Sequence, residues 1–233
     1  MIQQALPQGL SRRRVQQLLR KTKSCGSAAN RIEVLSRDLL GNPYKANPLI
    51  GSSDTPEVFT ASLDGFDCVT YIETILALAC ASTEDEFSKR LRKIRYEQGC
   101  VRWVRRNHYM TAWIRNNVKE GFVRRLAVPA KAALSRSRVL NVVPGLRPER
   151  IRVKCIPKPS IQRIEPSLQT GDLIFFASTR KNLDVFHSGI IIRDGQTLLM
   201  RHASRSRGFV VEQDVHEFLK ANRMAGVIVV RPI

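Results

Sequence analysis

The stretch SLDGFDCVTYIETILALAC, residues 62–80, decides the fold, because it predicts a buried helix that carries a cysteine in its first turn. Its apolar stripe has helical spacing and consists of Val69, Ile72, Leu76 and Ala79. Asp64 or Asp67 is the candidate N-cap, since a carboxylate there accepts hydrogen bonds from the first backbone amides of a helix. Cys68 would then lie at the positive end of the helix dipole, where a thiolate is favoured over a thiol. The same amides are candidates for an oxyanion hole, so the pattern predicts a reactive Cys68.

The other four cysteines lack this placement, and we expect each of them to be a small buried or incidental residue. They are Cys25, Cys80, Cys100 and Cys155. The total of five is odd, the spacing is irregular, and the sequence has neither a CxxC pair nor cysteines and histidines at zinc-ligand spacing. The pattern therefore predicts a reduced, intracellular protein without a metal site.

Two of the four histidines are brought together by a predicted hairpin, VFHSGIIIRDGQTLLMRHA, residues 185–203. Asp194-Gly195 is a strong two-residue hairpin turn, which would pair Arg193 with Gln196. In that register His187 lies directly opposite His202, with Cβ atoms about 4.5 to 5.5 Å apart. A bulge of one residue would break this alignment.

Such a pair of histidines suits catalysis by a cysteine. His187 would accept the thiol proton and later protonate the leaving amine, while His202 would fix the tautomer and orientation of His187. The alternatives are two histidines that meet by chance on a polar face of the sheet, or a metal pair that lacks further ligands. The cysteine at the helix start favours the catalytic interpretation.

Positive charge is concentrated in one part of the chain. The sequence has 39 basic and 20 acidic residues, and Glu86–Arg163 alone contains 21 Lys or Arg against four Glu, which is +17 of the net +19. Such a segment attracts polyanions, whether nucleic acid, anionic lipid or acidic cell-wall polymer, in a salt-dependent manner. We therefore expect an anionic polymer or surface as a possible partner of residues 86–163, with a solvated charged face as the alternative.

Periodicity predicts helices first and strands last. Helices are expected at about residues 11–25 and 27–40, with Ser11 as the first cap, and again over most of 86–126, before a loop-like stretch that extends to Pro159. From Thr170 onwards, short β-rich runs predict an antiparallel meander, with one helix before the last strand. We expect one domain over residues 1–233, made of four parts. These are basic N-terminal helices (1–40), a cysteine-bearing segment (41–85), a basic helical insertion (86–165) and a histidine-bearing sheet (166–233).

The sequence contains no run of eighteen or more apolar residues and no basic stretch followed by an apolar one near the N-terminus. This predicts a protein with no transmembrane segment that either stays in the cytoplasm or is exported without a classical signal peptide.

Several motifs resemble those of NlpC-type cell-wall hydrolases in the papain-like superfamily. They are GNPY (41–44), FDCVTYIE (66–73), TGDLIFF (170–176), FHSGIII (186–192) and RHAS (201–204). More narrowly, the stretch from about Leu40 to Pro232 resembles the N-acetylmuramoyl-L-alanine amidase-like family. The blocks that carry this resemblance are LGNPYKANPL, SLDGFDCVTYIETILALA, IRYEQG, RNHYMTAWIRNN and GVIVVRP.

The resemblance implies an α+β papain-like fold, in which a helical half with the cysteine packs on an antiparallel sheet. It implies Cys68 as nucleophile, His187 as base and His202 as the third member, and it places Tyr44 and Asp67 beside the cysteine. His108, with its neighbours Asn107, Tyr109 and Trp113, is a candidate lining of a substrate cleft. The alternative for His108 is simple packing among aromatic residues.

One departure from the family pattern bears on the substrate. Many NlpC-type endopeptidases have Asp-Cys-Ser-Gly and use the serine to bind a free N-terminal alanine, whereas Val69 and Thr70 follow Cys68 here. This disfavours γ-D-glutamyl endopeptidase activity and is compatible with hydrolysis of the muramoyl-L-alanine amide in peptidoglycan fragments, through a thioester and without a cofactor. Rival functions on the same scaffold are a peptide-stem endopeptidase, an antibacterial effector toxin and a lipid acyltransferase. A nucleic-acid or anionic-surface binding protein with a vestigial site is a rival of another class.

Overall fold

A computed structural model describes residues 7–126 and 133–233, and these form two compact units. Unit 1 contains the described residues up to Asn107 together with His202–Val211, and unit 2 contains His108–Arg201 together with Glu212–Ile233. The chain therefore passes between the units three times. One domain over residues 1–233, with four consecutive parts, stays a prediction.

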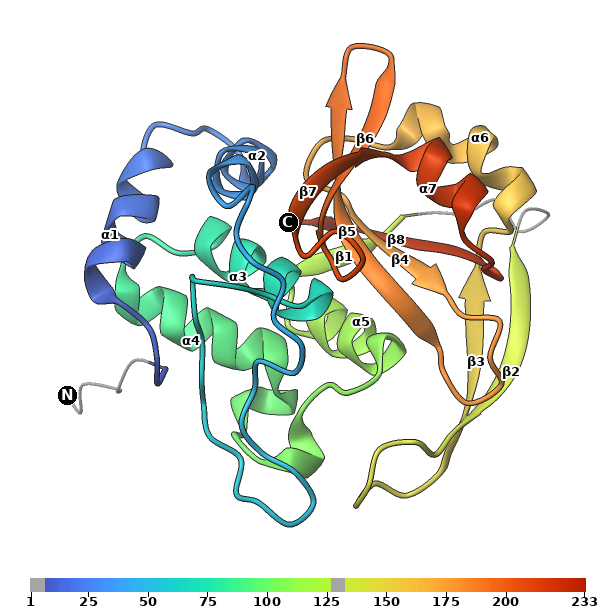
Figure 1. Cartoon of the computed structure of the whole chain (residues 1–233), viewed down its shortest axis with the longest axis horizontal. Helices are drawn as coiled ribbons and strands as arrows, with labels where there is room; N and C mark the ends of the chain where they lie inside the picture. The colour runs from blue at the N-terminus through green and yellow to red at the C-terminus, as the bar shows by residue number, and fades with distance from the viewer. Residues whose placement is uncertain (1–6, 127–132) are drawn as a thin grey trace. The chain divides into compact units, whose positions relative to one another are not determined.

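Four α-helices form most of unit 1 (Figure 1), and each begins at a residue whose side chain accepts a backbone hydrogen bond. They are α1 (Arg12–Lys21), α2 (Ala28–Asp38), α3 (Cys68–Ala79) and α4 (Glu84–Arg95), and the 3₁₀ turns η1 (Glu97–Gly99) and η2 (Trp103–Arg105) follow. Their caps are Ser11, Ser27, Asp67 and Thr83. The first two helices therefore begin where the sequence predicts, but they end earlier than expected.

Helix α3 is the centre of unit 1. Every residue from Thr70 to Ala79 is buried, and α3 packs against α1, α2 and α4. A helix with apolar residues around most of its circumference is stable in water only when other elements cover it on every side. Its start therefore has a fixed position within unit 1.

Antiparallel strands dominate the rest of the described chain, and six of them form one sheet in the order β1-β8-β4-β5-β6-β7 (Figure 1). Strands β6 and β7 each run from one unit into the other. The strands of the sheet are β1 (Val123–Arg125), β4 (Leu173–Ala177), β5 (Val185–Asp194), β6 (Thr197–Ser204), β7 (Phe209–Asp214) and β8 (Gly226–Pro232). The run from β4 to β7 is the predicted meander, and β8 returns to lie beside β4.

The two faces of the sheet in unit 2 are covered by different helices. Ile174 and Phe176 point to the face that packs against α6 (Ile161–Ile164) and α7 (Val215–Ala221). Phe175 points to the other face, where its ring lies 5.6 Å from that of Trp113 on α5 (Met110–Lys119). The alternation is that of a strand buried on both sides. With short 3₁₀ turns at η4 (Lys158–Ser160) and η5 (Glu165–Ser167), the described chain is a mixed α and β protein with seven α-helices.

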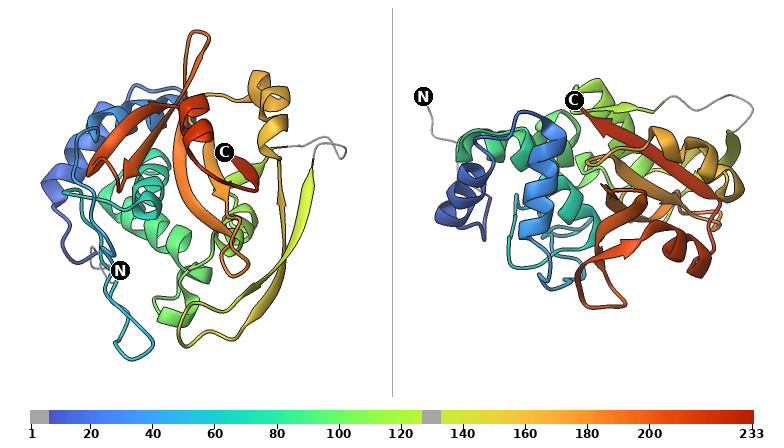
Figure 2. Two further views of the ribbon diagram at one scale, coloured as in Figure 1. Left: turned by 45° about the vertical axis from the view of Figure 1, so that its right-hand side comes forward. Right: turned by 90° about the horizontal axis from the view of Figure 1, so that it is seen from above.

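A two-stranded ribbon occupies part of the segment for which a helical insertion and loops were expected. Strand β2 (Leu134–Leu140) pairs with β3 (Glu149–Cys155) over their whole lengths, and the left view of Figure 2 shows the two side by side. On β3 the inward residues are Ile151, Val153 and Cys155, and the exposed ones are Arg150, Arg152 and Lys154. This period of two identifies a strand. The prediction of loops here was wrong because prolines and charges were given more weight than the alternation.

Membrane-spanning helices are not found among the described residues, since none of these helices is both long and apolar enough to cross a bilayer.

Candidate active site

Cys68 is the first residue of α3, and Asp67 is its cap, as predicted. The Oδ1 atom of Asp67 accepts hydrogen bonds from the backbone N of Val69 at 3.1 Å and of Thr70 at 2.7 Å. In return the backbone N of Asp67 donates to the hydroxyl of Thr70 at 3.1 Å, which completes a capping box. The reciprocal bonds fix the backbone on both sides of Cys68, whose side chain is partly exposed.

The capping box changes the expectation for an oxyanion hole. The amides of Val69 and Thr70 point at the Asp67 carboxylate, so they are occupied within the helix start. The sequence-based suggestion that the first-turn amides stabilise an oxyanion is therefore wrong for these two residues. An oxyanion would need other donors.

The segment around Tyr44 lies beside the residues that precede Cys68. The backbone N of Phe66 donates to the carbonyl of Pro43 at 3.0 Å, and the N of Lys45 donates to the carbonyl of Phe66 at 2.9 Å. On its other side, the N of Tyr44 donates to the carbonyl of Gly208 at 2.7 Å. Two segments far away in the sequence thus hold Tyr44 in place.

The pKa of the Tyr44 phenol depends on the charge of Cys68. Partial burial raises its pKa above the ordinary value, and the negative charges of Cys68 and Asp67 raise it further, whereas the positive charge of Arg205 lowers it. All four residues belong to unit 1. The predicted proximity of Tyr44 and Asp67 to the cysteine is consistent with this pattern.

His202 lies on β6 within unit 1 and is only 1% exposed. His187 lies on β5 in unit 2, where its ring stacks on Phe176 and Phe218 with centroid distances of 6.2 and 5.4 Å. The interplanar angles are 23° and 26°, so the two aromatic rings restrict the plane of the imidazole. Phe186 bulges out of the β4–β5 pairing directly before His187.

The hairpin that was expected to align the histidines has another register. Asp194 pairs with Thr197 and Ile190 with Arg201, so the two turn residues are Gly195 and Gln196. Gly195 has φ +57° and Gln196 is not among the residues with positive φ, which is the pattern of a type II′ turn with glycine first. The predicted turn at Asp194-Gly195 was therefore wrong, and the pairing is displaced by two residues.

Three of the four residues expected to line a cleft are buried. Asn107, in unit 1, donates its side-chain amide to the carbonyl of Ile94 at 3.1 Å, and Trp113 is 0% exposed. The hydroxyl of Tyr109 accepts from the backbone N of Val142 at 3.1 Å. These contacts give Asn107, Tyr109 and Trp113 packing roles. The half-buried His108 lies at the start of unit 2, and substrate contact by any of the four stays a prediction.

No sequence pattern predicted one element next to the candidate site, the turn between β6 and β7. Its Gly208 binds the backbone of Tyr44, and the N of Gly41 donates to the carbonyl of Val210 at 2.9 Å. No local pattern reveals such pairing, because the partners are far apart in sequence. No group of three or more His, Cys, Asp or Glu suited to a metal occurs in residues 7–126 and 133–233.

A family model described as N-acetylmuramoyl-L-alanine amidase-like matches residues 34–227, which is most of the chain. No curated protein matches it. Among solved structures, a protein of Legionella pneumophila superposes with a TM-score of 0.84 at 20% identity, over 95% of this chain and 94% of that one. Two structures of an N-acetylmuramoyl-L-alanine amidase from Bacteroides uniformis have TM-scores of 0.77 at 25% and 26% identity. They match 89% of this chain and 99% and 100% of theirs.

Proposed function

Because the chain belongs to the N-acetylmuramoyl-L-alanine amidase-like family, we propose that it is a cysteine amidase acting on peptidoglycan fragments. Its scissile bond is the amide that joins the lactyl group of N-acetylmuramic acid to L-alanine. Its fold is the papain-like fold of the NlpC type. The observation that carries the mechanism is the capped start of α3, with Cys68 as first residue and Tyr44 in its electrostatic neighbourhood.

In the proposed reaction, His187 takes the thiol proton and the sulfur of Cys68 attacks the carbonyl carbon of the amide. The C–N bond breaks as His187 returns the proton to the nitrogen of L-alanine, which leaves a muramoyl thioester on Cys68. Water, deprotonated by His187, then attacks the thioester, and the acid and the free thiol are released. No redox partner is required.

His202 is proposed to orient His187, despite the displaced register. Alternate residues of a strand share a face, so a displacement of two residues keeps the predicted pair on one face of the hairpin. Diagonal neighbours of this kind are about 7 to 8 Å apart by Cα, within reach of long or aromatic side chains. The triad draws Cys68 and His202 from unit 1 and His187 from unit 2, so its assembly stays a prediction.

The decisive experiment incubates the purified protein with defined muropeptides and measures the masses of the products. Release of the intact stem peptide from the sugar supports the amidase, whereas cleavage within the stem would identify an endopeptidase instead. Cys68→Ala and His187→Ala should abolish turnover, because they remove the nucleophile and the base. Cys80→Ala is the matched control, since Cys80 caps the opposite end of the same helix. Loss of activity in Cys80→Ala equal to that in Cys68→Ala would contradict the assignment.

A second candidate function, binding of an anionic polymer, is favoured by a cationic groove in unit 2. This groove of about 630 Å³ is formed by α5, β1, β3 and β8. The cations that line it are Arg115, Arg125, Arg150, Arg152 and Lys154. Its one carboxylate, Glu149, lies 3.5 Å from Arg115. Burial lowers the pKa of Arg125, and the negative charge of a bound anion would offset this effect.

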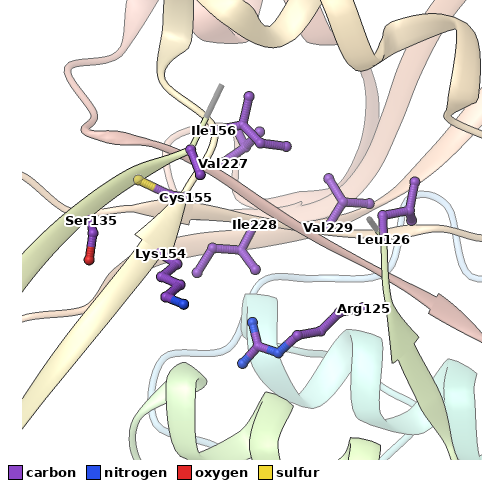
Figure 3. Close-up of a pocket in the computed structure, with 10 residues that line it drawn as sticks. Arg125, Leu126, Ser135, Lys154, Cys155, Ile156, Val227, Ile228 and Val229 are labelled. Carbon is purple, nitrogen blue, oxygen red and sulfur yellow. The ribbon is translucent and has the colours of Figure 1, made fainter. Parts of the chain in front are cut away.

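An adjoining cavity of about 480 Å³ shares Arg125, Lys154 and Ile228 with this groove. In Figure 3 the Arg125 and Lys154 side chains extend to the same side of β8, below Ile228. The alternate cations of β3 are about 6.8 Å apart along the strand, so a ligand with repeated negative charges could bind several at once. None of the described lining residues of the groove is aromatic, which disfavours stacking of nucleic-acid bases.

Salt-dependent binding of a DNA duplex and of anionic vesicles tests this second function. Arg150→Glu with Arg152→Glu should abolish binding if the groove is the site. The same change of charge at the exposed Arg13 and Arg20 of α1 is the control and should weaken binding only slightly. Equal losses in both double variants would show that net charge alone is responsible.

A further inference from the structure

The turn Arg205-Ser206-Arg207-Gly208, which joins β6 to β7, is fixed against the segment that holds Tyr44. The N of Gly208 donates to the carbonyl of Ser204 at 2.9 Å, and the carbonyl of Gly208 accepts from the N of Tyr44 at 2.7 Å. The hydroxyl of Ser204 makes two further hydrogen bonds in the turn. It accepts one from the N of Arg207 at 3.4 Å and shares one with the hydroxyl of Ser206 at 3.3 Å. The turn therefore has a defined position in the part of unit 1 that contains Cys68.

Arg205 brings positive charge into that neighbourhood. Its side chain is exposed, and its charge lowers the pKa of the Tyr44 phenol, whereas the charges of Cys68 and Asp67 raise that pKa. Within the part of the chain that the structure describes, no carboxylate forms an ion pair with Arg205. A guanidinium in this position can form paired hydrogen bonds with an anionic group of a ligand at little desolvation cost.

Phe209, the first residue of β7, follows this turn directly and adds an exposed apolar side chain. It is 51% exposed, although its backbone is bridged to Pro43, the residue before Tyr44. Leu40, at the start of the same segment, is 36% exposed. Phe209 and Leu40 thus expose apolar side chains on two segments that backbone hydrogen bonds join, and exposed apolar side chains that gather on one surface mark binding sites.

We propose that the β6–β7 turn is a substrate-recognition element beside Cys68, in which Arg205 binds a carboxylate of the substrate and Phe209 packs against its sugar ring. This inference rests on the proposed amidase function and narrows it. The substrate class is a muramoyl peptide with a free carboxylate in the stem, rather than a neutral, amidated one. Arg205 gives selectivity by charge, and Phe209 gives selectivity for the saccharide.

Paired substrates test the role of Arg205. One is N-acetylmuramoyl-L-alanyl-D-glutamate, and the other carries amides in place of both the α- and the γ-carboxylate of its glutamate, which makes it neutral. Arg205→Ala should lower kcat/KM for the acid about 10- to 100-fold, mainly through KM, and leave the amidated substrate unaffected. Arg205→Lys should restore part of the difference. Arg13→Ala, at an exposed arginine of α1 outside the turn, is the control and should leave both substrates unchanged.

Phe209→Ala tests the second contact. It should lower kcat/KM for the muramoyl substrate but not for lactoyl-L-alanyl-D-glutamate, which has the same amide without the sugar. Phe209→Trp should retain the preference, because it keeps an aromatic surface. Equal losses on both substrates in Phe209→Ala, or on acid and amide in Arg205→Ala, would overturn the recognition role.

Binding to the Cys68→Ala protein separates the two proposals, since it requires no turnover. Calorimetry that shows the acid bound more tightly than the amide, with the preference lost in Cys68→Ala/Arg205→Ala, supports the recognition element even if the wild type hydrolyses neither. Such a binding preference without any hydrolysis by the wild type would refute the amidase function and leave the turn as a ligand-binding site. Hydrolysis of the acid and the amide at equal rates would support the amidase function and refute the recognition role of the turn.

Discussion

Arg95 on α4 donates from Nε to the Glu73 carboxylate on α3 across 2.7 Å, and the two side chains are only 1% and 2% exposed. Arg95 also donates to the carbonyl of Thr60. Glu73 lies on the helix that begins with Cys68, so the pair ties that helix to α4, and Arg95 also binds the loop that precedes α3. A pair of charges at this depth is costly to form and still more costly to break.

Replacing one member should therefore destabilise the protein strongly. Arg95→Met removes the positive charge that lies against the buried Glu73 carboxylate, and we expect a loss of about 3 to 5 kcal/mol in the free energy of unfolding. Thermal denaturation should show a decrease in Tm of about 10 °C or more. The double variant Glu73→Leu/Arg95→Met removes both charges and should recover much of this loss. A double variant as unstable as Arg95→Met would mean that the arginine acts mainly through Thr60.

Gly65 is required by the close approach of the Tyr44 segment. A Cβ atom at this position would lie 2.9 Å from the carbonyl oxygen of Pro43 and 2.8 Å from the side chain of Lys45. We expect Gly65→Ala to displace the segment, to cost about 1 to 3 kcal/mol and to lower activity. Denaturant unfolding and the muropeptide assay measure the two effects. Gly26→Ala is the control, because nothing lies within 4 Å of a Cβ there, and it should be nearly neutral in both assays.

The titration of Tyr44 reports on its charged neighbours. Its raised pKa places ionisation above the ordinary range of tyrosine, and burial is the largest cause. Asp67→Asn removes a negative charge and should lower the pKa, whereas Arg205→Ala removes a positive charge and should raise it further. The difference in tyrosinate absorbance between each variant and its Tyr44→Phe counterpart isolates this residue. Shifts of the opposite sign would contradict the placement of Arg205.

The register of the β5–β6 hairpin depends on Gly195, whose φ of +57° is unfavourable for residues with a side chain. Gly195→Ala should cost about 1 to 2 kcal/mol and lower Tm by several degrees. Gln196→Ala, at the other turn position, has negative φ and should change Tm little. If Gly195→Ala were neutral, the positive φ of Gly195, and with it the type II′ turn, would be wrong.

Local chemistry explains which parts of the fold could be predicted from the sequence. Ser11 and Asp67 cap their helices as expected, because a cap depends on residues within one helical turn. The β-rich runs after Thr170 also became strands, since alternation and turn residues lie close together in the sequence. The same reasoning correctly placed Cys68 in a first turn.

Features that depend on competing turns or on distant partners were not predictable in this way. The Asp-Gly pair favours one two-residue turn and Gly-Gln another, and a change of one residue in the turn displaces the whole ladder by two. The Arg205 turn is recognisable only through its bonds to the Tyr44 segment. The ribbon formed by β2 and β3 was detectable in principle from Ile151, Val153 and Cys155, but the surrounding arginines obscured the pattern.

The three passages of the chain between the units affect how the protein can be made and inherited. During synthesis on the ribosome, the hydrogen bonds of Gly41–Tyr44 form only after Gly208 and Val210 have emerged, so unit 1 cannot be completed before His202–Val211 is made. Neither unit is one continuous stretch of the gene. A single recombination event between two relatives would therefore leave at least one unit with residues from both parents. We expect the two units to be inherited together for this reason.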